Sequence, residues 1–403
     1  MPHSTPVATP LAIVAGHLCL DIIPTIHAPP SQGAALLSPG KLTHIGPAAL
    51  ATGGAVSNTG LALHRFGITT RLMGKIGDDL FGRAILDIVG QRDPTLAEGM
   101  IVDPNSPSSY TIVISAPGFD RSFLHCSGAN DTFSAADVDD KRLAGATLFH
   151  FGYPPIMRRM FEDGGQELVT LFQRVQAATI ATSLDMAHVD VGAPAGLVDW
   201  RALLSRVLPH VDLFLPSLDE IFFMLEPERL RKIEATTDKP HLAVQGGLAL
   251  LRGLAETLLE MGAAIVGLKL GDQGIYLRTT ADTARLSRVG RLALSPAWLN
   301  RELLAPTFQV SVVGTTGAGD CAVAGFLAAV LRGLGPEAAL TAAVGAGACN
   351  VEVADAISGI PTWEALQTRI ERGWPRHSLS VPLPGWQLDE ENGLWYNPCH
   401  NNL

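Results

Sequence analysis

A glycine-rich segment toward the C-terminal end of the chain has residue types and spacing suited to phosphate chemistry. Residues 312–320 read VVGTTGAGD and lead directly into an apolar, helix-like segment. Glycine lets a backbone approach a ligand closely, and the unpaired N–H groups at the start of a helix favour an anion. We therefore expect the backbone of Gly317, Ala318, Gly319 and Asp320 to stabilise a transferring phosphoryl group. Asp320 would take the proton of the attacking hydroxyl, which is the role of the base in phosphoryl transfer.

Two upstream segments have the same turn-like character. Residues 53–58 read GGAVSN and run into a helix-like stretch, and residues 74–82 read GKIGDDLFG. Taken singly, each segment could be a plain turn with its polar residues at the start of a helix. Asp78 and Asp79 suggest a metal site, but we favour a turn that caps the helix beginning at Leu80.

In this order and spacing, the segments resemble the signatures of the ribokinase-like (PfkB) carbohydrate kinases. Residues 316–320 and the following helix resemble the second signature, residues 74–82 resemble the first, and residues 53–58 resemble the substrate-binding turn. The resemblance covers roughly residues 11 to 372. It assigns the substrate-binding positions to Asp21, Gly53, Gly54 and Asn58, with Asp21 holding substrate hydroxyls and the other three lining the sugar pocket.

The resemblance also implies a nucleotide site. Glu220 resembles the family's Glu that helps to hold Mg²⁺ and the phosphates, usually through water. A cation that keeps several waters and uses few protein carboxylates is the arrangement that Mg²⁺ prefers. ATP and Mg²⁺ are therefore the expected cofactors. The residues expected to contact the nucleotide are Lys269, Gly271, Gly274, Thr316 and Asn350.

The chain departs from the family pattern at three places. Gly314 stands where the second signature usually opens with Asp, a position tied in the family to a monovalent-cation site, so the need for such a cation stays open. Ser217 replaces the usual Asn of the segment that contains Glu220. Residues 151–155 contain no carboxylate, although some sugar kinases of this kind add a substrate contact there. This last difference disfavours simple ribokinase specificity.

Apolar strand-like segments alternate with amphipathic helices, a pattern that predicts an α/β fold with a mainly parallel, twisted sheet covered by helices on both faces. The alternating stretches 109–115 and 121–126 predict a β-hairpin that belongs to a small β-sheet lid. Strands of the large sheet are expected at residues 11–15, 70–73, 147–151, 180–185, 211–215, 264–268 and 274–278. Helices are expected at residues 55–66, 80–89, 166–178, 200–208, 218–225, 248–261, 318–332, 336–351 and 363–372.

The simplest domain organisation is one ribokinase-like kinase domain over residues 1–373, with lid elements at approximately residues 17–47 and 109–126. Residues 374–403 are rich in Pro, Asn and Trp, and we expect an irregular tail that packs on the body or is partly disordered. The connections at residues 226–248 and 279–310 are longer than the family's usual ones.

Composition narrows the functional classes. The formal net charge is -10 and there is no basic block, which argues against nucleic acid or an anionic membrane surface as a partner. The five cysteines are widely spaced and form no C-x-x-C, so reduced thiols are expected. The first apolar run is broken by His17 and Asp21, which does not fit a signal peptide. We expect a cytoplasmic protein.

The expected function is transfer of the γ-phosphoryl group of ATP to a hydroxyl of a small sugar or sugar-like substrate. A nucleoside (adenosine-like) kinase stays open as an alternative, as does a non-catalytic ligand-binding protein on the same fold. The retained Asp320 and Glu220 argue against the binding protein, because a binding module needs no base. A homodimer that forms through the lid also stays open.

Overall fold

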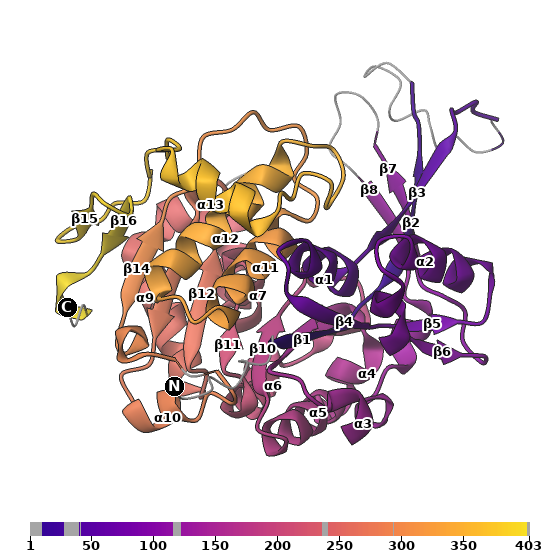
Figure 1. Ribbon diagram of the computed structural model, residues 1–403, viewed down its shortest axis with the longest axis horizontal. Helices are drawn as coiled ribbons and strands as arrows, with labels where there is room; N and C mark the ends of the chain where they lie inside the picture. Colours follow the sequence, from indigo (N-terminus) through magenta and orange to yellow (C-terminus); the bar gives the residue numbers. More distant parts are fainter. Residues whose placement is uncertain are drawn as a thin grey trace, which may run out of the picture.

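The backbone forms one large sheet, covered by helices, and a smaller sheet that projects from it (Figure 1). The computed structural model describes residues 10–27, 40, 42–115, 122–235, 241–292 and 294–400. The large sheet has the strand order β15-β16-β14-β13-β12-β11-β10-β9-β1-β4. Strands from β4 to β12 in this order are parallel, whereas those from β12 to β15 pair antiparallel. The mainly parallel α/β sheet is thus confirmed.

The strands of the large sheet lie close to where the apolar segments predict them, apart from the last three, which the sequence does not reveal. Their bounds are β1 Leu11–Gly16, β4 Thr69–Met73, β9 Leu148–Gly152, β10 Ala181–Asp185, β11 Leu213–Phe214, β12 Ile265–Lys269, β13 Ile275–Thr279, β14 Glu302–Ala305, β15 Gln387–Asp389 and β16 Leu394–Tyr396.

Side chains alternate across the sheet and fill a core on each face. In β1, Ala12 and Val14 belong to one core, whereas Ile13 and Ala15 belong to the other. Successive strand residues point to opposite faces, so strands that are apolar at every position must be buried on both sides. The helices over the first core are α1 Ala55–Arg65, α2 Leu80–Gly90, α11 Ala318–Leu331, α12 Pro336–Val351 and α13 Trp363–Glu371. Those over the second core are α3 Asp140–Leu143, α4 Arg158–Phe161, α5 Gln166–Ala177, α6 Trp200–Val207, α7 Leu218–Leu225 and α9 Leu242–Glu260.

The small sheet has four strands in the order β3-β2-β7-β8, and it stands out from the body at the upper right of Figure 1. We call it the lid. The predicted hairpin is confirmed as the antiparallel pair β7 and β8, and its expected Pro117-Gly118 connection lies outside the described residues. The strand β3 was not expected from the sequence. The lid strands are β2 Cys19–Pro24, β3 Ala48–Gly53, β7 Tyr110–Ile114 and β8 Ser122–Cys126.

The C-terminal segment is more regular than its composition suggests. Strand β16 pairs with β14, and β15 pairs with β16, so the segment extends the large sheet at the left edge of Figure 1. The Trp374 ring stacks on Phe308 at 4.4 Å between centroids. The expectation of an irregular tail is therefore corrected, while its packing on the body is confirmed. Backbone pairing with β14, which is distant in the sequence, organises this segment.

The long connections carry secondary structure of their own. Residues 226–248 contain helix α8, Pro227–Glu234, and residues 279–310 contain β14 and helix α10, Thr283–Ser287. Among the described helices, α9 alone is long and apolar enough to span a membrane by length and composition. It packs against α7 and the strands β12 and β13, so the core accounts for its apolar side chains.

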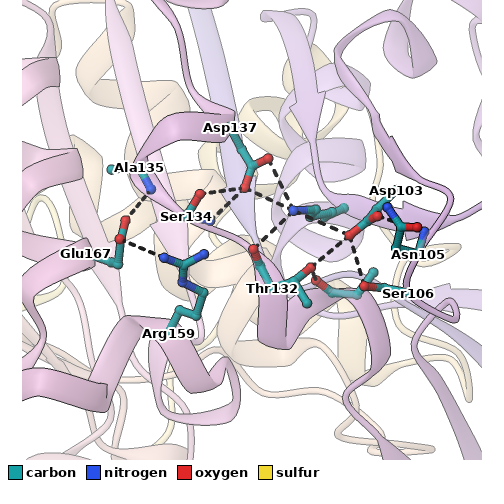
Figure 2. A network of polar contacts seen from close by, with 11 residues as sticks. Asp103, Asn105, Ser106, Thr132, Ser134, Ala135, Asp137, Arg159 and Glu167 are labelled. Atoms are coloured by element: carbon teal, nitrogen blue, oxygen red, sulfur yellow. Dashed lines mark hydrogen bonds and ion pairs between the residues drawn. The ribbon is translucent and has the colours of Figure 1, made fainter.

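The first signature is a structural turn. As expected, Asp79 caps α2: its side chain accepts a hydrogen bond from the Gly82 backbone N–H at 2.8 Å. Lys75 lies in β5, Lys75–Gly77, which pairs with β6, Ile101–Asp103, and its Nζ is 3.3 Å from both Asp137 oxygens. Figure 2 shows the surrounding network. Asp103 and Asp137 form ion pairs with Lys75 Nζ, and the Thr132 carbonyl accepts a hydrogen bond from it. This charged group connects the start of α2 to the segment that follows β8.

Candidate active site

The glycine-rich segment turns directly into α11. Gly317 is the N-cap of this helix and has a left-handed backbone, with φ 76°. A Cβ atom there would also lie 2.7 Å from the Ala356 carbonyl oxygen, so both conformation and space require glycine. The first N–H groups of α11 lack partners within the helix, and this is the geometry that favours an anion. The segment predicted to form the anion hole is therefore the start of a long helix.

Asp320 lies in the first turn of α11 and is only 2% exposed. Its Oδ2 accepts a hydrogen bond from Asn58 Nδ2 at 2.9 Å. The Tyr153 hydroxyl lies 2.8 Å from both carboxylate oxygens and donates to them. Burial raises the pKa of Asp320, and the hydrogen bonds from Asn58 and Tyr153 and the charge of Lys269 oppose that rise. A carboxylate with a raised pKa suits a general base.

Of the predicted sugar-binding residues, Asn58 contacts Asp320, and the other three lie around the turn that leads into its helix. Asp21 lies on β2, opposite Ala51 of β3, and Gly53 ends β3. A Cβ atom on Gly53 would lie 2.8 Å from Asp21 Cγ, so only glycine leaves this carboxylate its place. Gly54 has φ 87° and caps α1, the helix that carries Asn58. Burial raises the pKa of Asp21, against hydrogen bonds from Cys19 and Thr111.

Two histidines join the lid to the body. His17, which follows β1, and His125 of β8 have their Nε2 atoms 3.3 Å apart. His125 Nδ1 is also 3.0 Å from the Thr111 hydroxyl of β7. Burial and the neighbouring His125 lower the pKa of His17 to about 3, and burial lowers the pKa of His125. Both rings are therefore neutral near pH 7 and can exchange hydrogen bonds with polar ligands.

A buried ion pair lies beside the anion hole. Lys269, the last residue of β12, has its Nζ 2.6 and 2.7 Å from the two carboxylate oxygens of Asp185, the last residue of β10. Burial alone would lower the pKa of Lys269, but Asp185, Glu220 and Asp320 raise it above its ordinary value. Burial raises the pKa of Asp185, and Lys269 opposes this rise. Lys269 therefore stays cationic next to several carboxylates.

Glu220 forms hydrogen bonds with Ser217 and also lies near the charges of Lys269, Asp185 and Asp320. Its carboxylate accepts a hydrogen bond from the Ser217 backbone N–H at 2.7 Å, while the Ser217 hydroxyl accepts one from the Glu220 N–H at 3.3 Å. This capping box explains how Ser can stand at the position where the family usually has Asn. No group of three or more metal-binding side chains occurs among the described residues. The carboxylates nevertheless place a negative field around Lys269.

A cavity of about 380 Å³ opens beside the start of α11. Three residues predicted to contact the nucleotide line it, Lys269, Gly271 and Gly274, together with Ala318 and Gly319 at the start of α11. Apolar side chains form most of its wall, and these are Ile275, Phe308, Val310, Val312, Ala322, Val344, Ala348 and Val351.

Two residues predicted to contact the nucleotide are not among those that line this cavity. Thr315 lines it, whereas its neighbour Thr316 does not. Asn350 is fully buried and donates to the Ala356 carbonyl at 2.5 Å. That bond holds the loop that packs on Gly317, so Asn350 supports the start of α11.

Residues 35–363 match the model of the pfkB family of carbohydrate kinases. The chain belongs to this family. It is therefore a carbohydrate kinase, a phosphotransferase that acts on sugar hydroxyls. The ribokinase of Bacillus subtilis is 24% identical over 355 residues, which cover 87% of this chain and 95% of that protein.

Solved structures show the ribokinase-like fold of this pfkB kinase. A fructokinase of Xylella fastidiosa with bound ATP superposes with a TM-score of 0.66 at 18% identity, covering 90% of this chain and 98% of that one. The ribokinase of Arabidopsis thaliana, complexed with ribose and ATP, gives a TM-score of 0.65 at 20% identity, with the same coverage. These structural similarities support the fold, including the large sheet and the four-stranded lid.

Sequence reasoning missed Tyr153, Asp185, His17 and His125 in this pfkB kinase. Asp185 ends a predicted strand, so its position at the carboxyl edge of the sheet was a usable signal. Tyr153 lies in the segment noted for its missing carboxylate, where a phenol now faces Asp320. The two histidines gave no signal, because their contact depends on how the lid folds over the body.

Proposed function

We propose that this chain transfers the γ-phosphoryl group of ATP to a hydroxyl of a sugar or sugar-like substrate, with Asp320 as the general base. The observation that carries the proposal is the position of Asp320: a buried carboxylate in the first turn of α11, next to Gly317 with its positive φ. On one side lie Asn58 and the Asp21 turn, and on the other the apolar cavity.

The chemical step follows from this arrangement. The acceptor hydroxyl gives its proton to Asp320 while its oxygen forms a bond to the γ-phosphorus. The bond between that phosphorus and the β–γ bridging oxygen breaks, and ADP leaves with the electron pair. The N–H groups of Gly317, Ala318, Gly319 and Asp320 stabilise the charge on the transferring group. Lys269 adds a positive charge at the same edge of the sheet.

The apolar cavity suits the adenine ring of ATP, with its phosphates toward Gly319 and Lys269. The surroundings of Glu220 fit Mg²⁺, since Asp185, Glu220 and Asp320 raise the local negative charge and offer no closed protein cage. Mg²⁺ would neutralise phosphate charge there, with Glu220 holding its water shell.

The acceptor site points to a polyhydroxylated molecule. Asp21 offers a carboxylate to hydroxyl groups, and His125, a neutral imidazole that contacts His17, shares the Thr111 hydroxyl with Asp21 as a partner. A lid that closes over the acceptor excludes water, the competing phosphoryl acceptor.

The test is ATP consumption with Mg²⁺ against a panel of free sugars, sugar acids and nucleosides. We expect turnover with a sugar or sugar acid, saturating in both substrates. Turnover with nucleosides only would assign a nucleoside kinase instead. If no compound is phosphorylated but one of them raises the melting temperature, the chain is a binding protein on this fold.

We also propose that two copies pair through their lids. Leu50 of β3 and Phe123 and Leu124 of β8 are 53%, 56% and 51% exposed. Exposed apolar side chains on a projecting sheet favour burial against a second copy. Light scattering should give a dimer for the wild type and a monomer for Leu50→Ser/Phe123→Ser; a wild-type monomer at micromolar concentration would contradict the pairing.

The thiols fit the expected cytoplasmic compartment. Cys19, Cys126, Cys321, Cys349 and Cys399 are all free, and three of them are buried. We propose a cytoplasmic kinase that works with reduced cysteines. Fractionation of the source cells with an antibody to the chain tests this directly, and recovery outside the cytoplasm would contradict it.

A further inference from the structure

Tyr153 has an unusual backbone at the point where it meets the proposed base. It directly follows β9 and has a left-handed conformation, with φ 70° and ψ 40°. A bulky aromatic residue seldom adopts this conformation, and such exceptions persist where the surrounding structure holds them for a purpose. Here the conformation goes with a phenol whose oxygen is 2.8 Å from both oxygens of Asp320.

The hydrogen bonds of Asp320 distinguish its two oxygens. Oδ2 accepts from both Asn58 and Tyr153, whereas Oδ1 accepts from Tyr153 alone among the described residues. Each carboxylate oxygen offers two acceptor positions. The single Tyr153 proton is shared between the two oxygens, and Oδ2 has the Asn58 bond in addition, so Oδ1 has the freer acceptor positions for the acceptor hydroxyl. The base atom is thus Oδ1, and the Tyr153 phenol fixes the rotation of the carboxylate that presents it.

The Tyr153 hydroxyl keeps its proton and therefore remains a hydrogen-bond donor. Tyr153 is half-buried as a residue, and the desolvation of its hydroxyl together with the charge of Asp320 raises its pKa well above 10. A hydrogen bond to the ionised form of a carboxyl group lowers the pKa of that group, so Tyr153 opposes the effect of burial on Asp320. The other titratable groups that face this pair are Lys269 of β12, Asp185 of β10, Glu220 of α7, Cys321 of α11 and His17, whose ring centre is 6.1 Å from that of Tyr153.

We propose that Tyr153 is a positioning residue for phosphoryl transfer, which orients Asp320 with Oδ1 toward the acceptor hydroxyl and keeps the carboxylate ionised. This inference rests on the proposed function, in which Asp320 is the base. It explains why the segment after β9 needs no carboxylate: a phenol there acts through Asp320.

The test compares Tyr153→Phe with the wild type and with Tyr276→Phe. Tyr276 serves as the control because its hydroxyl, like that of Tyr153, donates to a buried carboxylate, here that of Glu302, at 2.8 Å. Tyr276 lies in β13 and is fully buried, whereas Tyr153 is half-buried. Both variants lose a hydrogen bond from a phenol to a buried carboxylate, so a purely structural effect should appear in both and should be at least as large in Tyr276→Phe.

We expect Tyr153→Phe to lower kcat about tenfold, the effect of losing one hydrogen bond to a charged group. Without this donor the pKa of Asp320 rises, so the base becomes protonated at higher pH and the acid limb of the kcat/KM profile moves upward. Tyr276→Phe should keep the wild-type profile. A Tyr153→Phe profile that superposes on the wild type overturns the proposal, as does a faster variant with a lower KM for the sugar, since the phenol would then occupy the acceptor's place.

A second measurement separates this proposal from the proposed function. The pH titration of the Asp320 carboxyl carbon can be followed by ¹³C NMR, with the signal assigned by its loss in Asp320→Asn. We expect a higher titration midpoint in Tyr153→Phe than in the wild type. If the wild type phosphorylates nothing, the proposed function fails, while this titration still decides whether Tyr153 keeps Asp320 ionised. Equal midpoints would overturn the proposal even in an active kinase.

Discussion

Asn58 of α1 and Asp320 of α11 are 262 positions apart in the chain, yet Asn58 Nδ2 lies 2.9 Å from Asp320 Oδ2. The helices that carry them pack against each other, and the Thr59 hydroxyl also lies 3.4 Å from the Asp320 carbonyl. The turn predicted to bind the sugar and the turn predicted to bind the phosphoryl group are therefore one structural unit.

Lys269 and Asp185 should be strongly coupled in their contributions to the free energy of unfolding. Lys269→Met leaves the buried Asp185 carboxylate without its cation, at a cost of roughly 3–5 kcal/mol in the free energy of unfolding. Lys269→Met/Asp185→Asn removes both charges and should recover most of that loss, because the asparagine oxygen can still accept from the Met186 N–H.

Urea unfolding of the wild type, both single variants and the double variant gives the coupling free energy. A cost below about 1 kcal/mol for Lys269→Met, as measured for exposed pairs, would show that water screens this pair.

Gly53→Ala should weaken sugar binding specifically. The new Cβ would lie 2.8 Å from Asp21 Cγ and closer still to its Oδ2, so the carboxylate must move away from its place. We expect KM for the sugar to rise about tenfold or more, the effect of a lost charged hydrogen bond, with KM for ATP unchanged. Steady-state kinetics in both substrates test this.

The matched control for that substitution is Gly90→Ala, since a Cβ there meets no atom within 4 Å. It should leave both KM values unchanged. Equal effects of the two variants on the sugar KM would remove Asp21 from the sugar site.

His150 should make stability sensitive to acid. It is fully buried on β9, with its Nδ1 3.0 Å from the Ser183 hydroxyl, and burial followed by the charge of Lys269 lowers its pKa to about 3. The unfolded chain protonates histidine near pH 6.5, so the folded state favours the neutral ring. Stability from this group is present above pH 6.5 and is lost as the pH falls from there toward about 3.

The free energy of unfolding should accordingly fall by about 1.4 kcal/mol per pH unit more steeply in the wild type than in His150→Gln between pH 6 and pH 5. Urea titrations at both pH values measure this. Parallel pH dependence in the two proteins would mean that His150 is already protonated, or solvated, in the fold.

The pattern of apolar residues and glycines predicted those elements whose burial follows from their own sequence. In β1, uninterrupted apolar residues match a strand buried on both faces, and α11 begins where the glycines of residues 312–320 end. The pattern failed where pairing partners decide the structure. The short strands β15 and β16 contain polar residues, and only the pairing of β16 with the β14 edge and of β15 with β16 makes them strands.

The same distinction holds for the site. Asp320 and Asp21 stand in recognisable segments, so their types and spacing identify them. Tyr153 and the Lys269–Asp185 pair are defined by contacts between strand ends that are far apart in the chain, which no local pattern encodes. The contact of Asn350 is equally invisible to local pattern: its side chain amide donates to the Ala356 carbonyl in the loop that follows α12.

The central claim is that Asp320 acts as the base, and the rate of ADP formation by Asp320→Asn on the preferred sugar tests it most directly. Asn keeps the shape and accepts from Asn58 but cannot take a proton. We predict a kcat at least about 100-fold below that of the wild type, with cooperative unfolding retained and with the exposed-site control Asp140→Asn fully active. An Asp320→Asn enzyme that turns over at the wild-type rate would contradict the account.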